Sequence, residues 1–428
     1  MERNREGMRR VGQRLMGPGA IALMGLALAS VPSQRAVRAA APPPVPAAPT
    51  PEVLREVFHN GEAGFVVTEI AYALGPDAKG SGSCPAGMSR GIRDLIKAYK
   101  DSPDGQRRTD EAEQAYERRV GMAVHAGAGG QNLCMHPELA GPDPLWRMVS
   151  GADVRVDGID LDGQDSAPGK RPAAGTCGHQ DFQGTHGERG IDNQFYRVVG
   201  CVPGFQSTGQ ANGWQTEMYT GSWGILISLK GVDDLRNDPD VQVGIYANAD
   251  PIQLSAARAA LPYATYAIDQ DPRFRAVAHG RIVDGVLTID PVDIRLHNIV
   301  NSMKDERVLR DARLRLTFTA DGGMEGFLAG YTPVDDMYNL QFGSRQSRTA
   351  KGDLAPERIR IQVSQGREDA FGHTCTGVYH ALQQAADGLR DPATGRCTGI
   401  STQYRIRIAP AFVVDTPTKS VNAPLAAR

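Results

Sequence analysis

Two acidic stretches and one histidine-rich stretch hold the side chains that could bind a metal ion. The first acidic stretch carries Asp157, Asp160, Asp162 and Asp165. Carboxylate oxygens are the ligands that calcium prefers. The spacing resembles the start of an EF-hand loop, but the register fails because position 12 of that loop would be Gly169. The sequence therefore predicts calcium here with a different geometry, and a pair of Asp-Gly turns is the alternative.

The second acidic stretch connects two strand patterns further along the chain. It holds Asp233, Asp234, Asn237 and Asp238. Their side-chain oxygens could bind calcium at the edge of a sheet. Asp and Asn are also common turn formers, so a plain turn is the alternative.

The histidine-rich stretch is a Gly-rich segment at residues 177–193. It carries His179, Asp181, His186 and Glu188. Imidazole and carboxylate groups bind zinc, and a zinc-bound water can act as the nucleophile of a hydrolase. The spacing matches no established zinc pattern, so zinc is the less favoured metal.

The structural alternative for this stretch is a short helix at residues 195–199, capped by Asp192, with both histidines in solvent. His373 and His380 lie seven residues apart around a predicted helix, and we expect them to share an exposed face. The sequence contains no nucleophile elbow, complete phosphate-binding loop, dinucleotide fingerprint or HExxH motif. It therefore predicts no catalytic residue, and whether the protein is an enzyme stays open.

The N-terminus predicts export from the cytoplasm. Five arginines lie within residues 3–14, an uncharged apolar run follows at residues 20–31, and small residues at 39–41 suit a signal peptidase. The apolar run is shorter than the roughly 20 residues of a transmembrane helix. We therefore expect residues 1–40 to be a signal peptide and residues 41–51 a proline-rich linker. The mature protein is expected to be periplasmic or secreted, without a transmembrane segment.

The cysteines agree with that location, because six cysteines in an exported chain favour disulfides. Their spacing suggests three local pairs, namely Cys84 with Cys134, Cys177 with Cys201, and Cys375 with Cys397. A zinc thiolate at Cys177 is the alternative for that residue.

The charge balance excludes one class of partner. The first 40 residues hold seven Arg and two Glu, so the net charge falls from -2 for the whole chain to about -7 for the remainder. A protein of this balance lacks the bulk positive charge that attracts nucleic acid.

Hydrophobic periodicity divides the mature chain into a helical segment at residues 52–150 and a β domain at residues 151–428. Helices are expected at residues 51–59, 88–99, 109–124 and 374–386, and strands at residues 223–229, 241–245, 281–289, 312–318, 359–363 and 404–414. Asp284 and Gly285 between two apolar runs indicate a hairpin. The pattern predicts a mainly β fold, an antiparallel β-sandwich or jelly roll with an N-terminal helical segment and a C-terminal helix.

These features together predict an exported, disulfide-stabilised binding or structural module that calcium stabilises. Sandwiches commonly bind ligands with the loops at one end, so a carbohydrate or a small molecule is the expected ligand. The alternative function is a metal-dependent hydrolase that uses the histidine-rich stretch.

Overall fold

The computed structural model describes residues 49–77, 82–151, 153–166, 177–212, 214–221, 223–300 and 303–417. The predicted signal peptide and most of the proline-rich linker lie outside these residues. Residues 46–428 form one compact unit. In the described part of the chain, no helix is both long and apolar enough to cross a membrane.

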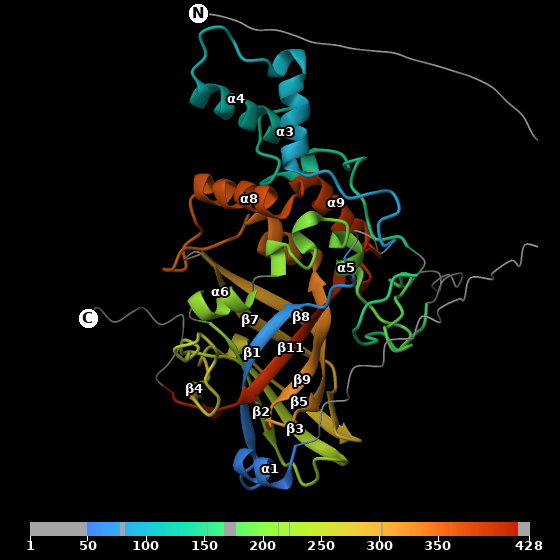
Figure 1. Cartoon of the computed structure of the whole chain (residues 1–428), viewed down its shortest axis with the longest axis vertical. Coiled ribbons are helices and arrows are strands. Elements are labelled where there is room, and N and C mark those ends of the chain that lie inside the picture. The colour runs from blue at the N-terminus through green and yellow to red at the C-terminus, as the bar shows by residue number, and fades with distance from the viewer. Residues whose placement is uncertain are drawn as a thin grey trace, which may run out of the picture. The chain divides into compact units, whose positions relative to one another are not determined.

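Antiparallel strands form the centre of the structure (Figure 1). They pair in the order β1-β2-β3-β5-β6-β8-β9-β11-β10, with β7 paired to β8. Strand β1 also pairs with β11, so the sheet closes on itself. The strands are β1 (Ala63–Tyr72), β2 (Ile225–Lys230), β3 (Asp238–Ala247), β4 (Thr265–Ala267), β5 (Arg275–Val283), β6 (Val286–Ile289), β7 (Val292–Val300), β8 (Met303–Phe318), β9 (Met324–Pro333), β10 (Gly388–Arg390), β11 (Cys397–Pro410) and β12 (Phe412–Val414).

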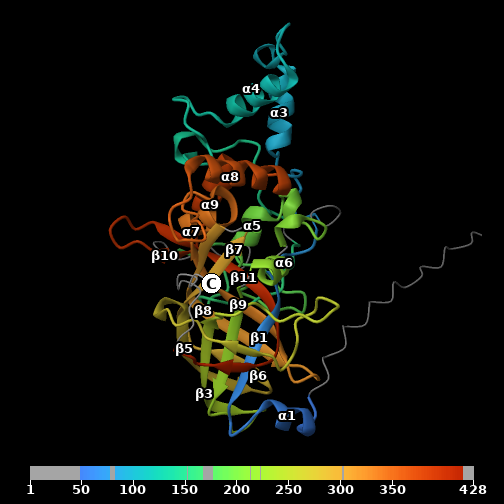
Figure 2. The same ribbon diagram turned by 90° about the vertical axis from the view of Figure 1, so that its left-hand side faces the viewer.

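Helices gather mainly at one end of this sheet, where α8 and α9 lie, whereas α1 lies at the opposite end (Figures 1 and 2). The helices are α1 (Pro51–Val57), α3 (Ile92–Asp101), α4 (Glu113–His125), α5 (Gln194–Val199), α6 (Trp214–Gly221), α7 (Val334–Tyr338), α8 (Glu357–Phe371) and α9 (Cys375–Gln384). Short helical turns lie at Pro103–Gly105, Pro137–Leu139, Pro203–Phe205, Gln210–Asn212, Pro272–Phe274 and Asn339–Gly343.

The predicted mainly antiparallel β fold with helices is confirmed. The exact sandwich form is not, because β1, the first strand of the order, also pairs with β11, the last but one, so the strands close into one continuous sheet. Residues 52–150, expected to be helical, also contribute β1 to the sheet. The hairpin at Asp284 and Gly285 is confirmed by the pairing of β5 with β6.

One predicted strand is wrong, because residues 359–363 lie within helix α8. The alternation of Ile359, Ile361 and Val363 has the period of a strand. The helix instead buries Ser364 and Glu368, which are four residues apart and polar. A pattern read from apolar residues alone therefore missed the buried face of α8.

Apolar side chains fill the interior of the closed sheet. Ile225, Ile227 and Leu229 alternate along β2, and Leu314 and Leu316 do the same along β8, all within one buried cluster. Intervening residues of β8 face outward because successive side chains of a strand point to opposite faces. On that outer face Ile159 and Leu161 contact Ala329 and Tyr331 of β9. The described residues 157–166 and 177–192, which we call the outer segment, are therefore held against the outside of the sheet.

Three disulfides tie distant parts of the chain together, and the predicted local pairs are wrong. Cys84 bonds Cys201, Cys134 bonds Cys375, and Cys177 bonds Cys397, with sequence separations of 117, 241 and 220 residues. The local pairing assumed that each bond closes a nearby loop. Closure of the sheet instead brings β11 and α9 beside segments from the first half of the chain.

Candidate functional site

Two described parts of the outer segment are fixed to the sheet by one buried glutamine. Gln403 of β11 accepts a hydrogen bond from Ile159 N at 2.8 Å and donates to Ile159 O at 2.7 Å. Its amide also donates to Asp192 O at 2.5 Å. Arg313 of β8 adds a hydrogen bond to Leu161 O at 2.9 Å. Ile159 and Asp192, which are 33 positions apart in the sequence, therefore meet over β11.

Three carboxylates converge at this meeting point. One oxygen each of Asp160, Asp162 and Asp192 lies within 4.8 Å of the others. Backbone hydrogen bonds set their positions: Asp160 accepts from Gly163 N at 2.6 Å, and Asp162 accepts from Gln164 N at 2.8 Å. Gly163 has a φ of 76°, a left-handed conformation that glycine adopts without strain. We call Asp160, Asp162 and Asp192 the aspartate triad.

Two further buried carboxyl groups lie behind the triad. Asp181 accepts a hydrogen bond from Ser166 N at 2.6 Å and is within hydrogen-bonding reach of Asp192. Burial, opposed by the Ser166 hydrogen bond and reinforced by nearby aspartates, raises the pKa of Asp181. Burial likewise raises the pKa of Asp192. Burial raises the pKa of Asp387 to about 7, although Ser401 N donates to it at 2.6 Å.

The arginines near these acids bind mainly neutral groups. Arg197 donates to Gln194 Oε1 at 2.6 Å and to Gln180 O at 2.5 Å. Arg313 donates to a backbone carbonyl, as described above. The cluster thus concentrates negative charge or protons in a partly buried place. Such an arrangement suits a hard cation with oxygen ligands, and calcium takes six to eight of these.

The other two members of the first acidic stretch point elsewhere. Asp157 accepts hydrogen bonds from the backbone and hydroxyl of Thr185, and it lies 3.8 Å from Arg405. Asp165 forms an ion pair with Arg189 at 2.6 Å. The structure therefore brings Asp160 and Asp162 together with Asp192, and does not add Asp157 or Asp165 to that triad.

The second acidic stretch forms a backbone-bonded turn. Asp238 accepts from Asp233 N at 2.7 Å, from Asp234 N at 3.3 Å and from Asp240 N at 3.1 Å. Against the effect of burial, these hydrogen bonds lower the pKa of Asp238. Asn237 accepts a hydrogen bond from Asp284 N at 3.0 Å. Asp238 therefore organises this connection by satisfying its backbone donors.

The histidine-rich stretch does not converge on one point. Nε2 of His179 donates to Ala386 O at 3.0 Å, and burial lowers the pKa of His179. His186 is exposed, and Glu188 accepts from its backbone nitrogen at 3.0 Å. Asp181 instead belongs to the acidic cluster. Among the described residues, no possible metal-binding group contains either histidine.

Two smaller expectations about this region are wrong. Helix α5 is capped by Asn193, which accepts from Tyr196 N at 3.2 Å, while Asp192 accepts from Leu161 N at 2.6 Å. His373 is buried beside Phe342, with ring centroids 5.0 Å apart, and does not share an exposed face with His380. Burial lowers the pKa of His373 to about 3, so the ring is neutral.

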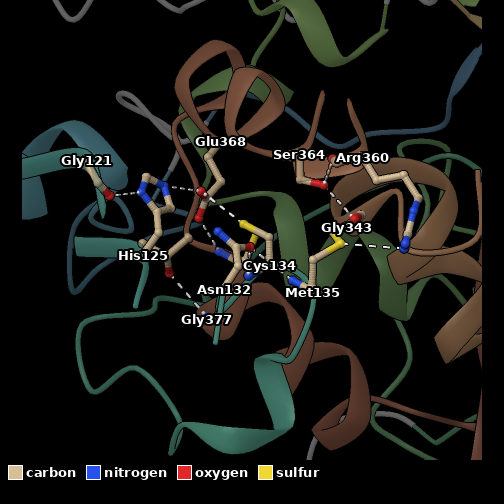
Figure 3. Close-up of polar contacts among 12 residues, drawn as sticks. Gly121, His125, Asn132, Cys134, Met135, Gly343, Arg360, Ser364, Glu368 and Gly377 are labelled. Atoms are coloured by element: carbon tan, nitrogen blue, oxygen red, sulfur yellow. Dashed lines mark hydrogen bonds and ion pairs between the residues drawn. A yellow bond between two sulfur atoms is a disulfide. The ribbon is translucent and has the colours of Figure 1, made fainter. Parts of the chain in front are cut away.

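A second carboxylate cluster lies between α4 and α8 (Figure 3). Nε2 of His125 is 2.8 Å from Glu368 Oε2, and its Nδ1 is 2.7 Å from Gly121 O. Glu368 also accepts from Cys375 N at 2.6 Å and lies 3.2 Å from Cys134 Sγ. Both cysteines are joined in a disulfide, so neither offers a thiolate to a metal. We call this group the Glu368 cluster.

Sequence reasoning missed both the Glu368 cluster and the role of Asp387. The sequence relates Asp192 only to its own stretch, as one of its carboxylates or as a helix cap. No spacing rule joins Asp192 to Asp160, because Gln403 and the sheet bring them together. Only a prediction of contacts between distant residues could have found this site.

Comparison with known proteins adds no assignment. The chain matches no protein-family model, and neither curated proteins nor solved structures show a significant match. The class that the structure itself defines is a mainly antiparallel β protein with helices and three disulfides.

Proposed function

We propose that the protein is an exported binding or structural module in which calcium, held by the aspartate triad, fastens the 157–192 segment to the sheet. The observation that carries this proposal is the convergence of three carboxylate oxygens within 4.8 Å. Arg197 and Arg313 donate to neutral acceptors rather than to the triad, so calcium would be the cation in direct contact with its carboxylates. Apolar contacts with β9 and the hydrogen bonds of Gln403 already hold the segment on the sheet. Calcium would add a third attachment.

Protons compete with calcium in this proposal. The pKa values of Asp181 and Asp192 are raised chiefly by burial, so these groups hold protons to a higher pH than ordinary aspartates. Calcium binding requires the ionised form and releases those protons. Calcium affinity should therefore increase as the pH rises.

The test compares the free energy of unfolding in EDTA with that in calcium, measured by urea denaturation. Calcium at a hundred times its dissociation constant should stabilise the protein by about 2.7 kcal/mol. Magnesium should stabilise it less, because it demands a smaller octahedral site. Asp162→Asn should lose the calcium response, since the amide keeps one oxygen but removes the charge.

Two matched controls come from the same predicted calcium ligands. Asp165→Asn and Asp233→Asn remove exposed or turn carboxylates outside the triad. Both variants should keep the full calcium response. Absence of any response at a few millimolar calcium would overturn the proposal, because extracellular calcium modules bind with dissociation constants of about 0.1 to 1 mM.

Export to the periplasm or the medium is part of the proposal. The three disulfides support it, because disulfides persist in oxidising compartments. N-terminal sequencing of the protein from each cell fraction tests it. A new N-terminus near residues 36–41 is expected outside the cytoplasm, and an uncleaved chain retained in the cytoplasm would contradict export.

A further inference from the structure

A cavity of about 320 Å³ lies beside the aspartate triad, between the outer segment and strands β5, β6 and β8. Its charged lining consists of Arg189, Arg281, Arg313, Arg315, Asp160 and Glu188. We call it the arginine cavity. The proposed calcium site uses none of these arginines as a ligand, so their grouping calls for a separate explanation.

Strand register places two of the arginines on the same face of the sheet. Arg281 of β5 pairs with Thr288 of β6, and Thr288 pairs with Arg315 of β8. The two arginines therefore flank Thr288, two strand spacings or about 10 Å apart. Arg313 lies two residues before Arg315 and therefore shares its outer face. The sheet thus presents a row of guanidinium groups to the cavity.

These guanidinium groups are only partly neutralised. The side chain of Arg315 has neither a hydrogen bond nor an ion pair with any residue that the structure describes. Arg281 lies 3.7 Å from Asp290, but both side chains are more than half exposed, so this pair is weak. Arg313 binds a backbone carbonyl, and its buried Nε has no partner within the described ranges. An anion in the cavity would relieve the repulsion between these charges.

The rest of the lining defines the ligand further. Asp160 and Glu188 can accept hydrogen bonds from hydroxyl groups and would repel a polyanion. Ile159, Ile191 and Ile289 supply apolar surface for a ring. The volume is at the lower end of the range for small-molecule sites. The chemistry that meets all three features is a small ring bearing hydroxyl groups and one anionic group.

We propose that the arginine cavity binds an anionic saccharide, a small sugar with a carboxylate or phosphate group. Guanidinium groups form paired hydrogen bonds with carboxylates and with phosphates, so Arg281 or Arg315 would bind that group. The hydroxyl groups would donate to Asp160 and Glu188. This inference rests on the proposed function as a binding module, but not on its calcium site.

The test is isothermal titration calorimetry of the mature protein with four probes: glucuronate, glucose 6-phosphate, glucose and inorganic phosphate. At least one of the two anionic sugars should bind at least about tenfold more tightly than glucose or inorganic phosphate. Arg315→Gln should weaken that binding about tenfold, the scale of one charge-assisted hydrogen bond. Arg236→Gln is the matched control, because Arg236 is exposed in a turn outside the cavity, and it should bind as the parent does.

Three outcomes would overturn the inference: no binding of either anionic sugar, equal binding of inorganic phosphate, or equal binding by the Arg315→Gln variant. Arg315→Gln should keep the calcium response, because Arg315 does not belong to the aspartate triad. If calcium does not stabilise the protein but the sugar binds as expected, the calcium proposal fails and the arginine cavity stands.

Discussion

The aspartate triad and the Glu368 cluster both bring carboxylate oxygens close to other possible metal ligands. They differ in which groups compensate the negative charge of those carboxylates. Glu368 has His125 on one oxygen and Cys375 N on the other. In the triad, Asp192 faces Asp181, another carboxyl group, while Asp160 and Asp162 bind only backbone nitrogens among the described residues.

This difference teaches that closeness of oxygens does not by itself identify an ion site. A buried carboxylate that has its own cationic partner joins elements of the fold, as Glu368 joins α8 to α4. A carboxylate that faces other carboxylates has no such partner and must hold a proton or a cation. The two clusters should therefore respond in opposite ways when one carboxylate is removed.

Glu368→Ala is expected to have the largest effect. It removes the partner of a buried His125 and the acceptor of Cys375 N, and breaking one side of a buried pair costs about 3 to 5 kcal/mol. Urea denaturation measures the loss. Asp369→Ala is the matched control, because its exposed pair with Arg93 should contribute little. Equal stability of the two variants would contradict the structural role of Glu368.

Asp192→Asn should act in the opposite direction in calcium-free buffer. The amide can still accept from Leu161 N but cannot become negatively charged. Asparagine needs no proton on folding, whereas Asp192, with its raised pKa, must take one up or bury a charge, so the variant should be more stable by an amount on the order of 1 kcal/mol at neutral pH. The same variant should lose the calcium response. If the variant is less stable in EDTA and is still stabilised by calcium, Asp192 is not part of the calcium site.

The pH dependence should separate the two clusters with a smaller effect. Burial alone would lower the pKa of His125, but the hydrogen bond and charge of Glu368 outweigh it, so the pKa is raised. A raised pKa contributes stability that is present below the unfolded value, near pH 6.5, and is lost as the pH rises through the folded value. His125→Gln should therefore flatten the fall in stability above about pH 6.5.

Asp387 should affect the free energy of unfolding over a different, more acidic range of pH, which the same measurement covers. Its pKa is raised from 3.8 to about 7, so its contribution is lost as the pH rises across that interval. Asp387→Asn should flatten the curve there and leave the fall that depends on His125. Urea denaturation over a series of pH values distinguishes the two. If neither variant changes the slope of stability with pH in its own pH range, the groups do not hold protons as described here.

Local signals in the sequence predicted part of this molecule correctly. The Asp284-Gly285 turn and the alternating residues of β2 and β8 depend on neighbours along the chain, and the structure confirms them. Helix α4 begins at Glu113 rather than at Thr109, a boundary that local rules often misplace. The pairing of β1 with β11 depends on residues more than 300 positions apart and left no local signal.

The candidate site shows the same limit. The Asp160-Leu-Asp162-Gly163 spacing was visible in the sequence, and it supplies two of the three oxygens of the triad. Asp192 joins them through Gln403, a residue with no distinctive spacing. Glu368 gives no such signal, because the sequence predicts a strand at residues 359–363 and no helix around residue 368 whose buried face could carry this carboxylate.

The long separation of the cysteine partners determines the order in which the disulfides can form. Cys84 meets Cys201 after 117 residues, but Cys134 and Cys177 wait 241 and 220 residues for theirs. In a chain exported as proposed, the four early thiols enter the oxidising compartment long before Cys375 and Cys397 arrive. Any bond among them other than Cys84–Cys201 is incorrect and must be exchanged, a step that takes seconds to hours depending on catalysis. Recovery of the native protein should therefore depend on a disulfide isomerase in the producing cell.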